Sequence, residues 1–146
     1  MLKGENMEQN NEKKLYFKSI KYDLETINYI KFDRIDAGSK VIYMDEYNIL
    51  EVDNDYFSVV YSRTVGFSPK SIFDLKISYK IKFYFDDKTV KEYCNRLEEL
   101  KKITEIKATK AIEMCGVISR ASLLIADITM QNAGNTIVTP PYYKKG

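Results

Sequence analysis

The chain contains no histidine among its 146 residues, and this absence excludes several kinds of chemistry. Histidine is the commonest general base and the commonest side-chain ligand of metal ions, and histidine-based catalytic triads require it. The six glycines are scattered along the chain, and the phosphate-binding pattern GxxxxGK does not occur. We therefore expect a protein that holds no metal ion, no nucleotide and no other cofactor.

The remaining reactive side chains do not form a recognisable catalytic set. Cys94 and Cys115 are far apart in the sequence, which indicates two reduced core thiols rather than a disulfide framework or a metal site. The 21 acidic residues alternate with lysines, as on a solvated surface, and no pair stands out as a general acid and base. The 12 tyrosines fit either a recognition surface or ordinary sheet and interface positions. We expect no enzyme, although catalysis by carboxylates or tyrosines stays open as an alternative.

Length, composition and charge indicate a single folded domain. A chain of 146 residues with 45% hydrophobic and 30% charged residues can bury a core. The polar residues 1–13 are expected to form a flexible N-terminus, followed by one domain over residues 14–146. No apolar signal region follows the polar start, so we expect a cytoplasmic protein. The net charge of +2 gives no reason to expect nucleic acid as a partner.

Two central segments have the alternation of half-buried antiparallel strands. In residues 72–85 the odd positions are all apolar or aromatic, whereas the even positions from Asp74 to Lys82 are charged or polar. In residues 57–67 the odd positions are also apolar, and only Arg63 interrupts them. A short connection that contains Pro69 joins the two segments and predicts a hairpin.

Two further strands are expected before this hairpin. In residues 15–24 the side chains of Tyr16, Ile20, Tyr22 and Leu24 share one parity, with Lys18 among them, which predicts a strand. Residues 41–52 are rich in Val, Ile and Tyr, which is typical of strands. Residues 25–40 fit either a strand or an irregular apolar crossing, and they end in the turn sequence DAGSK.

Helices are expected after the strands. Residues 86–103 predict a short amphipathic helix capped by Asp86 or Asp87. A long helix is expected from about residue 106 to residue 131, where Glu113, Arg120 and Asp127 recur every seven residues and form one narrow charged stripe. The other six heptad positions from residue 111 to residue 130 hold only apolar or small side chains.

A helix that is apolar almost all round needs cover on a second side, because one sheet covers only one side. A membrane span would bring Arg120 and Asp127 into lipid at about 2.5 to 3.5 kcal/mol each, so we expect burial against another subunit and no membrane insertion. A glycine in a helix interior costs about 1 kcal/mol relative to alanine. Either a close approach of the partner helix requires Gly116, or the helix simply tolerates this cost. The expected oligomer interface steps by four and three residues along the helix and comprises Ile112, Gly116, Ser119, Leu123, Ala126 and Met130.

The helix sequence CGVISRASLLIADIT, followed by a loop and IVTPPYY, resembles the SecB family of protein-export chaperones. That family ends a long helix with a Ser-Arg pair and follows it with an apolar–Pro–x–aromatic segment. The sequence of residues 57–83 also resembles the middle strands of Gram-positive-type SecB-like members, so the resemblance covers most of residues 15–143. The matching motif residues are Ser119, Arg120, Ile137, Val138, Pro140 and Tyr143.

The resemblance implies an α+β fold in which a four-stranded antiparallel sheet packs on a long C-terminal helix. It implies a homotetramer, built as a dimer of dimers through these helices. It also implies an ATP-independent holdase that binds unfolded or partly folded polypeptides, for export or for the protection of a dedicated client such as an antitoxin. The translocase ATPase SecA is a candidate partner, but it docks on an acidic sheet face, and here the expected solvent face carries Lys76, Lys80 and Lys82.

Clients are expected to bind irregular aromatic segments, because the apolar side chains of the central strands must cover the helix. In the family, the client grooves run beside the crossing loop and the end of the long helix, which implies that these two segments meet. The expected client-binding residues are Ile27, Tyr29, Ile30, Phe32, Ile137, Val138, Tyr142 and Tyr143. The alternative function is an oligomeric adaptor or assembly protein on the same scaffold, with one specific protein partner.

Overall fold

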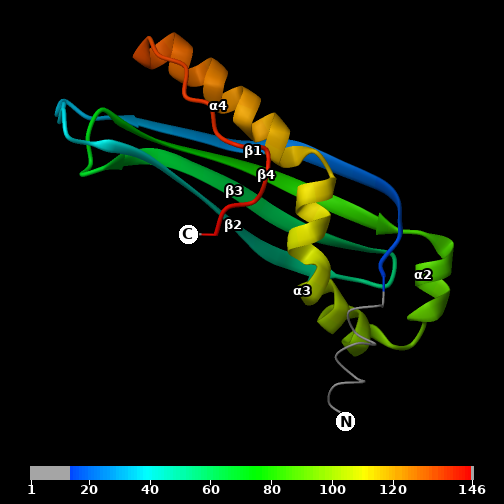
Figure 1. Cartoon of the computed structure of the whole chain (residues 1–146). Helices are drawn as coiled ribbons and strands as arrows, with labels where there is room; N and C mark the ends of the chain where they lie inside the picture. Colours follow the sequence, from blue (N-terminus) through cyan, green and yellow to red (C-terminus); the bar gives the residue numbers. More distant parts are fainter. Residues whose placement is uncertain (1–13, 146) are drawn as a thin grey trace.

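A computed structural model describes residues 14–145, in which four strands precede the helices (Figure 1). The expected flexible segment, residues 1–13, lies outside the described residues. The strands form one antiparallel sheet in the order β1-β4-β3-β2, and this confirms the expected α+β fold. The elements are β1 (Phe17–Lys31), β2 (Lys40–Val52), β3 (Tyr56–Ser68), β4 (Phe73–Phe85), α2 (Asp87–Glu92), α3 (Leu97–Met114) and α4 (Val117–Ala133).

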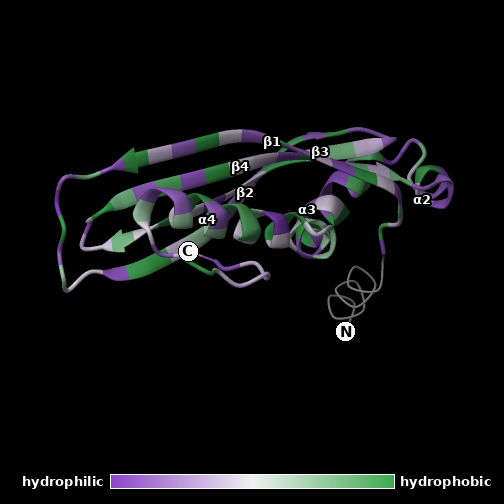
Figure 2. Cartoon of the chain, turned by 90° about the horizontal axis from the view of Figure 1, so that it is seen from above, coloured by the Kyte–Doolittle hydropathy of each residue, from purple (hydrophilic) through white to green (hydrophobic). Residues whose placement is uncertain are grey.

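The two central strands, β3 and β4, form the predicted hairpin and provide most of the core. Every odd position of β4 from Phe73 to Phe85 is buried, as are Phe57, Tyr61 and Val65 of β3. Hydrophobic and hydrophilic bands alternate along β1 and β4 in Figure 2, and the helices lie on one side of the sheet. The apolar side chains at the odd positions of the central strands therefore face the helices, as the sequence predicts.

Strand β1 runs through the segment that the sequence left undecided between a strand and a crossing. Its pairing with β4 shifts by one residue between Leu24 and Thr26. Tyr22 lies opposite Ile81 and Tyr29 lies opposite Leu75, so both tyrosines face the helices although they are an odd number of residues apart. The side chains that face the helices fall on one parity of sequence position before this bulge and on the opposite parity after it. A strict two-residue alternation therefore does not run through the whole strand, so the sequence pattern alone does not reveal it.

The single long helix expected over residues 106–131 is wrong. Helix α3 ends at Met114 and α4 begins at Val117, and between them Gly116 has a φ of 87°. This left-handed conformation suits glycine and interrupts the helix, so the chain changes direction there (Figure 1). Gly116 therefore lies at the break between two helices. The two interpretations from the sequence, a close approach of a partner helix and simple tolerance, both placed Gly116 inside one helix and do not apply.

The two helices bury one side each against the sheet. Ile112 of α3, and Val117, Ile118, Ala121 and Ile125 of α4, are buried in the core with the side chains of β3 and β4. The single helix expected over residues 86–103 is wrong in extent, because α2 ends at Glu92 and α3 begins at Leu97. The expected cap is confirmed for Asp86, whose carboxylate accepts a hydrogen bond from the Thr89 amide. Within residues 14–145, no helix is both long enough and apolar enough to span a membrane.

Candidate functional site

Arg63 lies in the middle of the core, where it interrupts the apolar side of β3. Its side chain is completely buried and is the largest one buried to this extent. It lies directly across the strand pair from Asp45 of β2, which is also buried. A buried cation requires a charge partner and hydrogen bonds to all its donors.

The Arg63 guanidinium binds Asp45 through two parallel hydrogen bonds. Nε donates to Oδ1 and Nη2 donates to Oδ2, each at 2.7 Å. The Tyr61 hydroxyl donates to the same Oδ1 at 2.7 Å. Such a bidentate pair is short, charge-assisted and fixed in orientation. The Tyr43 ring lies 5.2 Å from the guanidinium carbon and adds a cation–π contact.

The remaining Arg63 donors hold the chain that follows α4. Nη1 donates to the Thr139 hydroxyl at 2.9 Å and to the Pro140 carbonyl at 2.6 Å, and Nη2 donates to the Tyr142 carbonyl at 2.8 Å. Nη1 also donates to the Ser122 hydroxyl of α4 at 2.9 Å. One side chain therefore connects β2, β3, α4 and residues 139–145, which we call the tail segment.

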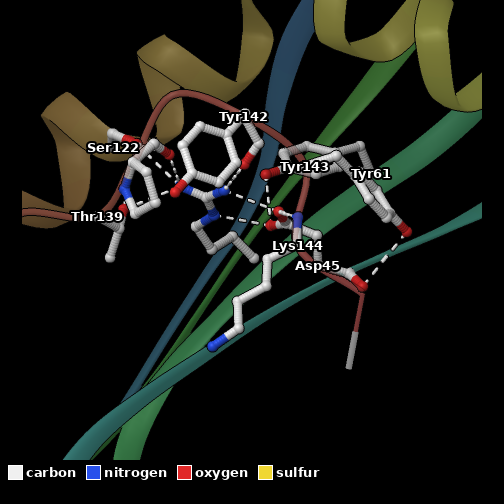
Figure 3. Close-up of polar contacts among 9 residues, drawn as sticks. Asp45, Tyr61, Ser122, Thr139, Tyr142, Tyr143 and Lys144 are labelled. Atoms are coloured by element: carbon white, nitrogen blue, oxygen red, sulfur yellow. Dashed lines mark hydrogen bonds and ion pairs between the residues drawn. The ribbon is translucent and has the colours of Figure 1, made fainter.

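Asp45 holds the next part of the tail segment through main-chain contacts. Its Oδ2 accepts a hydrogen bond from the Lys144 amide at 2.7 Å, and its own amide donates to the Lys144 carbonyl at 2.8 Å. Asp45 and Lys145 form a parallel β-bridge at the free edge of β2. Figure 3 shows Asp45 and Tyr61 beside Tyr143 and Lys144, with Ser122 and Thr139 at the other end of the cluster.

Burial and pairing shift the ionisation of this cluster. Burial is the largest influence and opposes the charge of Arg63, but the hydrogen bonds to Asp45 together with the electrostatic effects of Tyr61, Asp45 and Tyr43 raise the guanidinium pKa above its ordinary value. Burial and then the hydrogen bond to Asp45 raise the pKa of Tyr61. Burial, followed by the negative charge of Asp45, raises the pKa of Tyr143 to about 12. The guanidinium therefore stays charged and the two phenols stay neutral at physiological pH.

Arg63 and Asp45 bind the main chain of the tail segment. The Arg63 donors and both Asp45 carboxylate oxygens have partners from the chain itself. Among residues 14–145, no group of three or more Cys, Asp or Glu side chains could hold a metal ion. Both cysteines are free; Cys115 is half-buried as a core thiol would be, but Cys94 is exposed, so that expectation is wrong for Cys94.

The structure separates the two groups of expected client-binding residues. Ile27, Tyr29 and Ile30 lie on β1, at the opposite edge of the sheet from β2, to which the tail segment binds. The expectation that the two segments form one groove is therefore wrong for a single protomer. Ile27 and Ile30 are exposed, whereas Tyr29 is half-buried and its ring stacks on Phe73 at 5.2 Å.

The other expected client-binding residues also differ in exposure. Phe32 is half-buried, and its amide donates to the Ile72 carbonyl at 2.7 Å in the connection after β1. Ile137 is half-buried, while Val138 and Tyr142 are 80% and 59% exposed. The Tyr143 ring is half-buried, with its centroid 6.0 Å from that of Tyr47.

The expected interface residues of the long helix also divide into two groups. Ser119, Leu123 and Met130 are exposed on α4, and Ala126 is half-buried there. Ile112 is buried in the protomer's own core, so it cannot belong to the same surface. Gly116 is exposed, but it lies at the helix break.

A groove runs between α4 and the edge strand β1. It has a volume of about 520 Å³, and its lining combines the apolar Leu24, Leu123 and Leu124 with the charged Asp23, Arg120 and Asp127. Further along β1, Ile20 and Ile27 are also exposed and pair with core residues of β4 on the helix side of the sheet. Ile20, Leu24 and Ile27 form an apolar row on β1 that α4 does not cover.

Comparison with solved structures gives a relative for this fold. The SecB-like chaperone Rv1957 of Mycobacterium tuberculosis, in complex with a ChAD peptide from the Rv1956 HigA1 antitoxin, is similar with a TM-score of 0.53. The similarity covers 84% of this chain and 88% of that one, at 11% sequence identity, so it shows a shared fold alone. No protein-family model matches the sequence. No curated protein matches it either.

Proposed function

We propose that this protein is an ATP-independent holdase chaperone, which binds non-native polypeptides and acts in the cytoplasm. The observation that supports it best is the apolar row of β1 on a SecB-like fold. Ile20, Leu24 and Ile27 of β1 are large and exposed, and Leu24 lines the groove beside α4. Contiguous apolar surface of this kind, with polar rims, marks a binding site for protein chains.

The edge of β1 adds a second reason for polypeptide binding. β1 is 15 residues long, and its outer edge has no strand partner within the described chain. The unpaired amides and carbonyls of such an edge can bind an extended chain irrespective of its side chains. Apolar side chains beside them then select segments that a folded client would bury.

We also propose a homotetramer, a dimer of dimers, in which α4 contacts other protomers through Leu123 and Met130. Both side chains are more than half exposed in one protomer. SecA stays a candidate partner, but the sheet face that would receive it carries exposed Lys76 and Lys80. These lysines argue against an acidic docking site on this part of the sheet.

Suppression of aggregation tests the proposal. The wild-type protein should prevent chemically denatured citrate synthase from aggregating on dilution, without ATP. Leu24→Ser with Ile27→Ser should weaken this activity and preserve the fold, because both side chains belong to the apolar row and are exposed. Ile106→Ser, which removes an exposed apolar side chain of α3, is the matched control and should act as wild type. A wild-type protein that leaves aggregation unchanged would refute a general holdase.

A dedicated client is the second candidate, because the structural relative is in complex with an antitoxin peptide. In that case the protein would fail to protect citrate synthase but would retain one partner from its own cells. Affinity purification from those cells, with identification of the bound chains, distinguishes one partner from many. A single partner that is fully folded would instead support the adaptor.

A further inference from the structure

The tail segment lies on a surface formed by Asp45, Arg63, Ser122, Tyr43, Tyr47 and Tyr61, which we call the seat. We propose that the seat is itself a polypeptide-binding site. The tail segment fills it in the isolated protomer, and a bound client can replace the tail segment there. The occupant would be an extended segment of a non-native polypeptide. This inference rests on the proposed function, since it adds a second site to the same activity.

The pair recognises mainly the backbone of the tail segment. Arg63 donates to the carbonyls of Pro140 and Tyr142, and Asp45 exchanges two hydrogen bonds with the main chain of Lys144. These are alternate residues, as expected for an extended chain. Every polypeptide offers the same carbonyls and, apart from proline, the same amides, so these contacts tolerate many sequences.

A few side chains add a preference. The Thr139 hydroxyl accepts from Arg63, and the Tyr143 ring lies beside the rings of Tyr47 and Tyr61, with centroid distances of 6.0 and 6.4 Å. The Lys144 ammonium lies 4.3 Å from the Tyr43 ring centroid. In contrast, the Tyr142 side chain is 59% exposed. The preferred client segment therefore has Ser or Thr, an aromatic residue four positions later, and a basic residue next.

An empty seat would be unstable. A completely buried guanidinium that lost the carbonyls of Pro140 and Tyr142 would keep only Asp45 and the α4 hydroxyl as partners. Unsatisfied buried donors are strongly unfavourable, so the tail segment should leave only when another chain replaces it. The structure thus points to an exchange of occupants.

The tail segment sets a threshold for this exchange. Because it is covalently attached, it competes at an effective concentration in the millimolar range. A short free peptide therefore binds weakly, since the seat is available only for the fraction of time that the tail segment is away. A client that is already bound to the apolar row of β1 is held close to the seat, so its effective concentration there is also high. Such a client can therefore compete with the tail segment for the seat.

A labelled peptide and full-length variants test the exchange. The probe is a fluorescent peptide of residues 137–145, IVTPPYYKK. Tyr143→Ser weakens the attached tail segment but leaves Arg63 and Asp45 intact, so the peptide should bind this variant at least about tenfold more tightly than wild type. Thr139→Val, which removes one acceptor, should give a smaller gain. Ile106→Ser, at an exposed side chain of α3 outside this site, is the control and should bind the peptide as wild type does.

The peptide and a competitor provide further controls. A peptide with serine in place of Tyr143 should bind each protein less tightly than the original peptide. Reduced, carboxymethylated α-lactalbumin, a permanently unfolded polypeptide, should displace the original peptide from the Tyr143→Ser variant. Thermal melting of each variant establishes that it is folded.

Each outcome supports or overturns the inference. If the peptide binds no folded variant better than wild type, the seat is only an anchor for the tail segment and the inference fails. If the peptide binds but unfolded α-lactalbumin does not displace it, clients are not the occupant and the inference fails too. The holdase proposal is tested separately by citrate synthase aggregation, so a protein that suppresses aggregation but binds no peptide refutes only the exchange.

Discussion

At the scale of single residues, Arg63 and Asp45 have an asymmetric effect on stability. Replacing a buried ion pair by apolar side chains is often neutral, whereas removing one partner leaves an uncompensated charge in the core. Loss of the guanidinium also leaves the carbonyls of Pro140 and Tyr142 without their donor. The pair is therefore better understood as fixing the position of the tail segment than as a source of stability.

Arg63→Met should lower the free energy of unfolding by about 3 to 5 kcal/mol, because Asp45 stays buried without a cation. The double variant Arg63→Met with Asp45→Leu should recover part of this loss, since neither charge remains. Amide exchange at Lys144 should nevertheless be faster than in wild type, because Asp45 Oδ2 is its acceptor. Urea unfolding and hydrogen exchange measure the two effects. A double variant no more stable than the single one would contradict this account.

The Tyr143 phenol should make stability fall in alkaline solution. Its folded-state pKa of about 12 lies above the value of about 10 for an unfolded tyrosine. The contribution is complete below pH 10 and is lost between about pH 10 and 12, because the unfolded chain releases its proton first. Tyr143→Phe lacks this ionisation, so its melting temperature should fall less over that range. Tyr142→Phe, at an exposed side chain, should melt in parallel with wild type.

At the scale of elements, local patterns missed the bulge in β1, the break at Gly116 and the interruption between α2 and α3. The bulge lies between Tyr22 and Tyr29 and changes which sequence positions face the helices, so no single two-residue alternation fits the whole strand. The residues around Gly116 continue an apolar helical pattern on both sides of the break, and periodicity alone does not register one residue with a positive φ. The regular strands β3 and β4 were predictable because each keeps one parity throughout.

Gly116→Ala should destabilise the protein by about 1 to 2 kcal/mol through backbone conformation alone. A Cβ at this position would meet no atom within 4 Å, so steric overlap adds nothing. Gly116→Asn should be less harmful, because asparagine adopts the left-handed conformation more readily. Gly38→Ala is the control: its Cβ would make an ordinary contact of 3.4 Å, and its effect should stay within about 0.5 kcal/mol. Equal unfolding free energies for Gly116→Ala and wild type would show that the helices can join.

At the scale of the whole molecule, the sequence predicted the sheet, the order of elements and the uncovered side of α4. It did not predict the Arg63 cluster, although Arg63 was visible as the one interruption of an apolar parity. Its partners lie 18 residues before it and up to 79 residues after it, and pairing over such distances follows from the fold rather than from local spacing. The expected meeting of Ile27 with the tail segment failed for the same reason, since it required the order of strands in the sheet.

Light scattering should give a mass four times that of the 17.1 kDa protomer. Leu123→Lys with Met130→Lys should dissociate the tetramer, because an unpaired charge in an interface costs several kcal/mol. Both side chains are exposed in the protomer, so the dissociated variant should remain folded by circular dichroism. Met114→Lys changes another exposed apolar side chain, outside the proposed contact, and should remain a tetramer. A wild-type monomer at micromolar concentration would remove the proposed assembly.

The distance along the chain between Arg63 and the tail segment also affects how the protein is made. Thr139 is synthesised 76 residues after Arg63, which corresponds to roughly 4 to 15 s on the ribosome at 5 to 20 residues per second. During this interval β3 and β4 have emerged, but the guanidinium has none of its tail-segment acceptors. We expect that the nascent protein cannot close this part of its core until translation passes residue 142. Codon choice between residues 63 and 142 would then set how long each new molecule is exposed to aggregation.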